Sequence, residues 1–260
     1  MENTTLQLVA GVAMIAVGVI AIILWRTKTS VAYRWFWVGA GLWTVAVVLK
    51  VPFSILVGKS VMALLTDNAS STVRVLWAGL YFGLQSALFE MGLTILAALV
   101  WRRLGSDSTR AIAIGLGSGA FEAILLGLIA VVGIAVYLAG VPGTEKVAEA
   151  IDAQAAMTPL FWLLPPTERL LTLVTHASSR ALVLLGVAKG RYQLVLTGFL
   201  LFMALDGSVV ACLKALGSPI SMWWLEIAPL VFALISLPVL FWCHTRWKRV
   251  EVSQPGSQVS

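Results

Sequence analysis

The chain has 260 residues, of which 60% are hydrophobic and only 12% are charged. A soluble domain carries roughly 25% charged residues, so this composition excludes a soluble enzyme, a disordered chain and a nucleic-acid-binding module. The formal net charge of +6 is interpreted as an orientation signal in a membrane rather than as nucleic-acid binding. What remains is a multi-pass protein of the lipid bilayer with little protein outside the membrane.

Seven apolar runs are long enough to cross the hydrocarbon core, which needs about 20 residues. They cover about residues 6–25, 35–57, 75–101, 111–139, 167–188, 194–214 and 222–243. The sequence therefore predicts an all-α, polytopic bundle of seven transmembrane helices, forming one domain over residues 1–250 with its polar-core helices at about 75–214. Residues 251–260 are predicted to be a disordered tail. Pro165, Pro166 and Thr167 indicate the start of the fifth span, with Thr167 as its N-cap.

Basic residues predict the orientation of the spans. Most of them flank one side, namely Arg26, Lys28, Arg34, Arg102, Arg103, Arg110, Lys189, Arg191, Arg246, Lys248 and Arg249. The other side has Lys59, Arg74, Lys146 and Lys214. Because cytoplasmic loops carry the excess of Lys and Arg, the N-terminus is expected outside and the C-terminus in the cytoplasm. The predicted location is the bacterial plasma membrane.

Ionisable side chains lie deep in several of these spans, although each costs about 2.5–3.5 kcal/mol at mid-helix on insertion scales. Glu90, Glu122, His176 and Asp206 lie in four different spans at depths that can meet near the midplane. We expect them to face one another or a hydrated cavity rather than lipid. Lys50, two residues before Pro52, is interpreted instead as a snorkelling or kink-lining residue.

The fifth span carries further polar groups. Glu168 and Arg169 lie at its outer end, and Arg180 shares a helix face with His176 at a spacing of four residues. A histidine beside a fixed cation tends to stay neutral. Glycines precede two of the acids and predict close helix approach there; they are Gly79 and Gly83 before Glu90, and Gly115, Gly117 and Gly119 before Glu122.

Four segments, taken in order, carry a resemblance to a known family. They are LYFGLQSALFE at 80–90, GLGSGAFEA at 115–123, Glu168-Arg169 with His176, and Asp206. Together they resemble the YhfC family of bacterial membrane proteins, which are regarded as intramembrane metallopeptidases and are distantly similar to the PrsW and CAAX-processing proteases. The resemblance implies a membrane-embedded peptide or protein as substrate.

The resemblance also implies site roles. Glu90, Glu122 and His176 would be catalytic, and His176, Glu122 and Asp206 would hold a divalent metal, zinc or another ion. Glu168, Arg169 and Ser118, with Arg180 beside them, would bind substrate or stabilise charge.

The family pattern is incomplete in this chain. Met91, Thr94, Ser118 and Phe202 stand where the pattern has a glutamate, an arginine and two histidines. A peptidase metal needs about three protein ligands and an open position for water, and a single imidazole with carboxylates suits Mg²⁺ or Mn²⁺ better than Zn²⁺. The chain is therefore expected to be a YhfC-like peptidase or a degenerate, inactive relative that binds membrane-embedded segments.

Two other functions remain open from the residues. Intramembrane acids with a histidine also form proton relays, as in a proton-coupled transporter. Alternatively, the polar residues only fix helix register in a non-catalytic membrane scaffold subunit.

Overall fold

The computed structural model describes residues 2–67, 69–216 and 221–252, with side chains as far as Trp247. The helices are α1 (Glu2–Thr29), α2 (Arg34–Phe53), α3 (Lys59–Thr66), α4 (Ser71–Val100), α5 (Ser108–Leu138), α6 (Glu145–Met157), α7 (Leu164–Lys189), α8 (Tyr192–Leu216) and α9 (Ile227–Val252). A π-helical turn, η1 (Ser54–Gly58), joins α2 to α3, and 3₁₀ turns form η2 (Arg102–Gly105), η3 (Phe161–Leu163) and η4 (Met222–Glu226). The described residues contain no strand.

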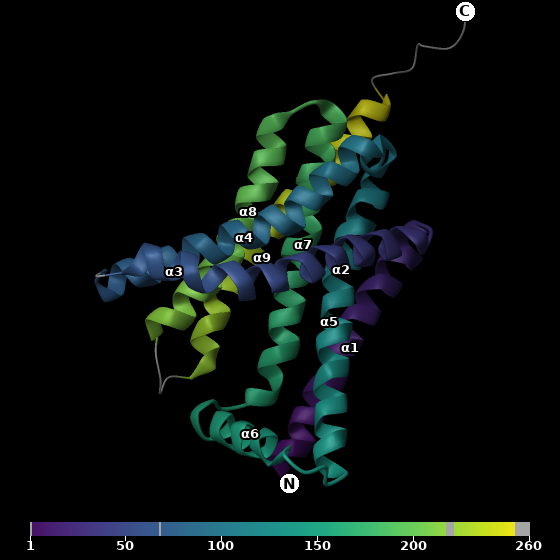
Figure 1. Ribbon diagram of the computed structural model, residues 1–260. Helices are drawn as coiled ribbons and strands as arrows, with labels where there is room; N and C mark the ends of the chain where they lie inside the picture. The colour runs from purple at the N-terminus through teal and green to yellow at the C-terminus, as the bar shows by residue number, and fades with distance from the viewer. Residues whose placement is uncertain (1, 68, 217–220, 253–260) are drawn as a thin grey trace, which may run out of the picture.

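Seven helical stretches of the described chain are long and apolar enough to cross a membrane. Each of them overlaps one of the predicted spans, so the prediction of an all-α, seven-span bundle is confirmed. The start of α1 and the end of α9 lie at opposite ends of the bundle (Figure 1). Which end faces the cytoplasm stays a prediction.

Three local features differ from the sequence expectations or extend them. Helix α7 begins at Leu164 with prolines in its first turn, so the prediction of Thr167 as its N-cap is wrong. The reason is that proline, which lacks an N–H, fits the first turn of a helix. The loop before α7 contains α6, which was not predicted. The predicted disordered tail began at residue 251, but residues 251 and 252 belong to α9, and residues 253–260 lie outside the described residues.

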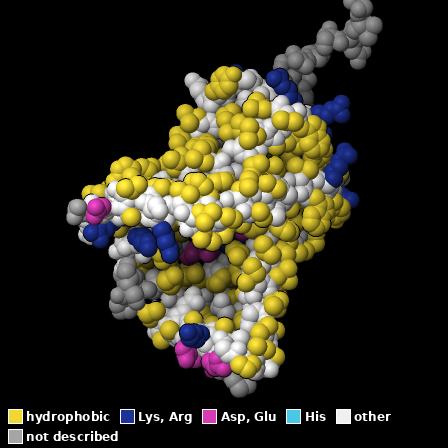
Figure 2. All heavy atoms as spheres, in the orientation of Figure 1, with side chains coloured by type: hydrophobic (Ala, Val, Ile, Leu, Met, Phe, Trp, Pro, Cys, Tyr) yellow, Lys and Arg dark blue, Asp and Glu magenta, His cyan; other side chains and the backbone are white. Residues whose placement is uncertain are grey.

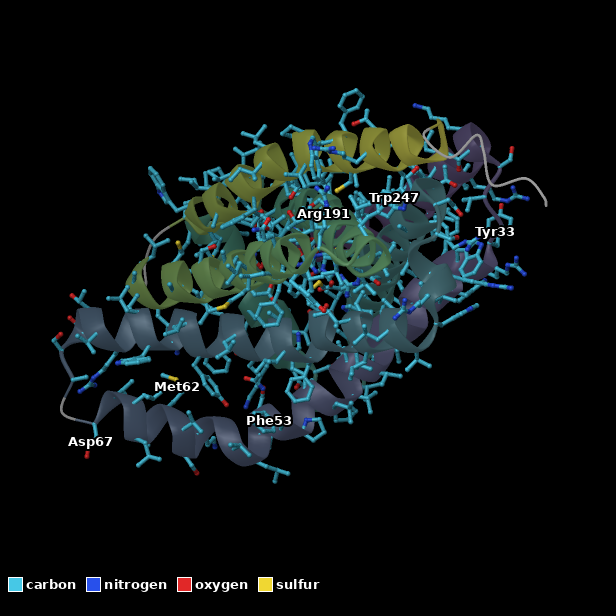
Figure 3. The ribbon with its side chains drawn as sticks, turned by 90° about the horizontal axis from the view of Figure 1, so that it is seen from above. Tyr33, Phe53, Met62, Asp67, Arg191 and Trp247 are labelled. Carbon is cyan, nitrogen blue, oxygen red and sulfur yellow. The ribbon has the colours of Figure 1, made fainter. Side chains whose placement is uncertain are left out.

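Helices α2 and α3 form one long rod across the bundle, named here the α2–α3 rod (residues 34–66). Figure 1 shows it crossing α5 and α7 at a steep angle, and Figure 3 shows it running beside α4, with Met62 directed toward α4 and Asp67 beyond the far end. Pro52 lies inside the rod, directly before the π-helical turn. A proline removes one backbone hydrogen bond, and π-turns of this kind are frequent at functional sites.

Glycines allow the close helix contacts that the sequence predicted. A Cβ on Gly83 would lie 2.4 Å from the carbonyl oxygen of Met203, so α4 and α8 meet at backbone distance. A Cβ on Gly117 would lie 2.2 Å from the carbonyl oxygen of Phe36, which fixes α5 against α2. These contacts hold the helices that carry the polar residues.

Helix α7 is the central element of the bundle (Figure 1), and 72% of its most apolar stretch is buried inside the protein. It ends at Gly190, which adopts a left-handed conformation (φ +63°) that favours glycine. Only Gly190 and Arg191 separate α7 from α8. The two helices are therefore tied closely together.

Candidate functional site

A polar cavity of about 480 Å³ lies where α2, η1, α4, α5, α7 and α8 meet. Figure 2 shows a hollow beneath the α2–α3 rod with acidic side chains at its back. The cavity wall mixes apolar residues with charged ones, and its ionisable residues are Lys50, Glu90, Glu122, Glu168, Arg169, His176 and Asp206. Glu90, Glu122, His176 and Asp206, predicted to meet, thus line one space.

The first part of the site is an ion-pair cluster between α5 and α7. Arg169 Nη1 lies 2.7 Å from Glu122 Oε1, and its Nη2 lies 2.5 Å from Glu168 Oε1. The other oxygen of Glu122, Oε2, lies 3.1 Å from His176 Nε2. Both oxygens of Glu122 therefore accept hydrogen bonds from groups on α7.

His176 is held at both ring nitrogens. Arg180 Nη1 lies 2.8 Å from His176 Nδ1. A guanidinium group can only donate hydrogen bonds, so Nδ1 accepts and the ring hydrogen sits on Nε2, where it is donated to Glu122. This arrangement is that of a neutral imidazole, as the sequence indicated for a histidine beside a fixed cation.

The second part of the site surrounds Glu90 on α4. Arg180 Nη2 lies 3.1 Å from Glu90 Oε2, and Lys50 Nζ lies 2.8 Å from Glu90 Oε1. Arg180 is fully buried and Glu90 is 3% exposed. Removing one partner of such a buried pair costs far more than the pair contributes, so each of these three residues depends on the others to compensate its charge.

Ser86 connects Lys50 to Asp206. Lys50 Nζ lies 2.9 Å from Ser86 Oγ, and Ser86 Oγ is also hydrogen-bonded to Asp206 Oδ2. Because an ammonium group only donates, Ser86 accepts from Lys50 and uses its own hydrogen for Asp206. A continuous network therefore runs from Glu168 to Asp206 across five helices.

Sequence reasoning placed most of this network but not all of it. Ser86 was missed, and the interpretation of Lys50 as a snorkelling or kink-lining residue overlooked its pairing with Glu90, although a lysine inside a predicted span is itself a signal for a buried partner. Ser118 was expected to bind substrate, but the structure does not bring it to the cavity. Its side chain is fully buried and donates to the carbonyl oxygen of Gly39 on α2, at 2.8 Å.

The predicted metal ligands His176, Glu122 and Asp206 do not form a ligand set. The one hydrogen on the imidazole points to Glu122, and Asp206 is bonded to Ser86. Among residues 2–67, 69–216 and 221–247, no group of three or more His, Cys, Asp or Glu side chains could hold a metal ion. Arg169 engages Glu122 Oε1, and Arg180 engages His176 Nδ1. The donor set in this arrangement therefore does not fit a metal.

The replaced motif positions are filled by packing. Met91 is fully buried in an apolar cluster with Ala87, Val183 and Phe202. Phe202 packs edge-on against the His176 ring, with ring centroids 5.1 Å apart. Thr94 is fully buried and donates to the carbonyl oxygen of Glu90 at 2.8 Å. The side chains at these three positions therefore take part in packing and in a backbone hydrogen bond, and none of them supplies the glutamate, arginine or histidine of the family pattern.

No curated protein and no solved structure matches the chain. The YhfC intramembrane metalloprotease family matches residues 13–228. This range covers more than half of the chain and contains every residue of the polar network, which confirms the resemblance that the four sequence segments indicated. The chain is a multi-pass helical membrane protein and belongs to the YhfC intramembrane metalloprotease family.

Proposed function

We propose that the protein is a degenerate YhfC family member, which binds a membrane-embedded peptide segment in the polar cavity and does not cleave it through a metal. One observation carries this proposal. The imidazole of His176 is bonded at both nitrogens, by Arg180 and by Glu122, and a neutral ring nitrogen without hydrogen is what a metal needs. Its Nδ1 has no hydrogen, but that nitrogen is taken by a guanidinium.

The packing at the lost motif positions supports the same proposal. Ser118 lies in the tight seam between α2 and α5, where a Cβ on Gly39 would come within 1.9 Å of the carbonyl oxygen of Ile114. A histidine in place of Ser118 would force the two helices apart. At this position the chain has thus lost the motif histidine, and the packing around Ser118 leaves little room for one.

The cavity suits a peptide segment that leaves the lipid. Its volume of about 480 Å³ is in the range of about 300–1,000 Å³ that is usual for binding sites. Apolar residues such as Val47, Phe82 and Val209 line it together with the charged groups. In lipid a non-helical backbone finds no hydrogen-bond partners. The polar side chains of a cavity inside the bundle could supply hydrogen-bond partners to a segment whose helix is bent or broken.

The site residues then have binding and supporting roles. Glu90, Glu122 and His176, first expected to be catalytic, hold the network together through Arg180 and Arg169. Residues with a carboxylate oxygen that accepts no hydrogen bond within the network would contact the bound segment. Asp206 and Glu168 meet this condition, because each accepts at one oxygen only among the described contacts.

We also propose that the protein resides in the plasma membrane with its C-terminus in the cytoplasm. The support is that basic side chains gather at one end of the molecule, visible at the upper right of Figure 2, as expected for a cytoplasmic face. Reporter fusions that are active only outside the cytoplasm check this orientation. They should give a signal at the N-terminus and none at the C-terminus.

The two alternative functions have weaker support. A proton relay through His176 would have to pass Arg180, and an arginine does not give up its proton in a protein. This interrupts the route between Glu122 and Glu90. A pure scaffold does not need a cavity with unsatisfied carboxylate oxygens.

Binding of a labelled peptide to the purified protein tests the proposal. The probe is an apolar 21-residue transmembrane peptide, measured by thermophoresis in detergent micelles, with mass spectrometry of the peptide after incubation with Zn²⁺, Mn²⁺ or a chelator. We expect saturable binding and an intact peptide under all three conditions. The substitution Val47→Trp, which fills the cavity, should abolish binding.

A matched variant controls for the added tryptophan. Val48 is the next residue on α2 and is 63% exposed on the outside of the bundle, so Val48→Trp should bind like the unmodified protein. Equal melting temperatures of the two variants would confirm that Val47→Trp is folded. Cleavage of the peptide that needs a metal and disappears in His176→Ala would overturn the proposal.

A further inference from the structure

The charges of the polar network do not cancel. Its carboxylates are Glu90, Glu122, Glu168 and Asp206, and its cations are Lys50, Arg169 and Arg180, one fewer. The hydrogen-bond pattern of His176 makes its ring neutral, so it does not supply the missing positive charge. An uncompensated charge is costly in a membrane. The cavity therefore has a net preference for a positive ligand.

The unbalanced charge is located at Asp206. Each cation of the network donates to two side chains, and Glu90 and Glu122 accept at both of their oxygens. Asp206 accepts at Oδ2 from the hydroxyl of Ser86, and no described residue donates to its Oδ1. This oxygen is a vacant acceptor on a residue that lines the cavity.

A second acceptor without a partner lies in the same wall. Gln85 is 4% exposed and lines the cavity. Its amide nitrogen lies 2.5 Å from Ser54 Oγ, but its carbonyl oxygen Oε1 is buried without a hydrogen-bond partner among the described residues. Buried polar atoms are usually satisfied, so this wall of the cavity holds, besides Asp206 Oδ1, a second acceptor whose hydrogen bond is missing among the described residues.

We propose that the cavity recognises a positively charged side chain, lysine or arginine, in the bound membrane segment, with its N–H groups directed to Asp206 Oδ1. This inference rests on the proposed function and names its ligand class. A basic side chain inside a bilayer has few favourable positions. Placed against Asp206, it gains a charge-assisted hydrogen bond and restores the balance of charge in the network.

Three peptides that differ at one position test the inference. The apolar 21-residue peptide carries lysine, norleucine or glutamate at its centre, and its affinity is measured by thermophoresis with the full protein in micelles free of amine lipids. We expect the lysine peptide to bind about tenfold more tightly than the norleucine peptide, and the glutamate peptide to bind least. The substitution Asp206→Asn should bring the affinities for the lysine and norleucine peptides to within about twofold of each other.

A chemically identical substitution outside the cavity is the control. Asp152 on α6 is bonded to Asn3, and Asp152→Asn should keep the lysine preference. Equal affinity for the lysine and norleucine peptides, or an unchanged preference in Asp206→Asn, would overturn this inference while the proposed function stands. Absence of binding for all three peptides would overturn the proposed function instead. Loss of the preference on adding phosphatidylethanolamine would assign the site to a lipid ammonium group and overturn the peptide assignment.

Discussion

The two halves of the α2–α3 rod belong to one continuous helical stretch but are held very differently. The first half packs tightly on α5 and contains all the buried residues of α2, namely Trp35, Phe36, Gly39, Ala40, Trp43 and Ala46. In the second half, residues 50–66, only Gly58 is buried, and α3 has no buried residue. Phe53 contacts Phe89 of α4 there, with ring centroids 5.4 Å apart.

The change from tight to loose packing along the rod occurs where the rod borders the cavity. Lys50, Val51, Ser54 and Ile55 line the cavity at the point where the rod stops packing on α5. Apolar packing of the first half fixes the position of the rod, and the ion pair of Lys50 with Glu90 holds the second half. The cavity therefore exists because close helix packing is given up along part of one helix.

The largest effect is expected from Gly39→Ala in the packed half. The new Cβ would lie 1.9 Å from the carbonyl oxygen of Ile114, and overpacking of this kind costs 1–3 kcal/mol or more. We expect the free energy of unfolding, measured by thermal unfolding in detergent, to fall by about 3 kcal/mol, or the variant not to fold. Gly41→Ala is the control, because a Cβ there meets nothing within 4 Å, and a comparable loss in that variant would refute the packing argument.

Ser118→His tests the same seam from α5. The residue is fully buried and bonded to Gly39 O, so we expect destabilisation of about 2–3 kcal/mol from overpacking and no gain of zinc affinity. Zinc titration measures the zinc affinity of the variant, and thermal unfolding of the same sample measures its stability. A stable variant that binds zinc would mean that the site can recover a metal ligand.

Lys50→Met is expected to have a smaller effect in the loosely packed half. It leaves Glu90 paired with Arg180 alone, and breaking a fully buried pair costs about 3–5 kcal/mol. Because 23% of the Lys50 side chain is exposed, we expect the free energy of unfolding to fall by only about 2 kcal/mol, measured by thermal unfolding in detergent. The double variant Lys50→Met with Glu90→Gln should recover part of this loss; a purely additive loss would mean that the two residues do not interact.

The smallest effect is expected from Gly58→Ala. A Cβ at Gly58 meets only Tyr81, at 3.7 Å from its hydroxyl oxygen, and alanine is favoured over glycine in a helix by about 0.5–1 kcal/mol. The melting temperature should stay the same or rise slightly. A loss as large as that of Gly39→Ala would show that both halves of the rod are packed alike.

The sequence predicted the spans and the main acids for a clear physical reason. Apolar length alone defines a membrane helix, and a charged residue inside one must find a partner. For this reason Glu90, Glu122, His176 and Asp206 could be expected in one cavity, and their meeting there is observed.

The pairing within the site was not predictable in the same way. Lys50 was interpreted as a snorkelling or kink-lining residue from its position before Pro52. Its partner, Glu90, lies on another helix, and the spacing within one helix says nothing about contacts between helices. Ser118 occupies a position of the family motif, in place of a histidine, yet its side chain faces α2, since helix rotation is set by the glycine contacts of α5. Which motif residues reach the cavity therefore depends on tertiary packing.

The short link between α7 and α8 has a mechanical consequence. With only Gly190 and Arg191 between the two helices, and Gly198 of α8 so close that a Cβ on it would lie 2.6 Å from the carbonyl oxygen of Ser179 on α7, His176 and Asp206 belong to one stiff unit. Across from them, the wall formed by residues 50–55 has no buried residue. We expect a bulky guest to displace that wall toward the lipid, which would break the largely buried ion pair of Lys50 with Glu90 but little buried apolar contact.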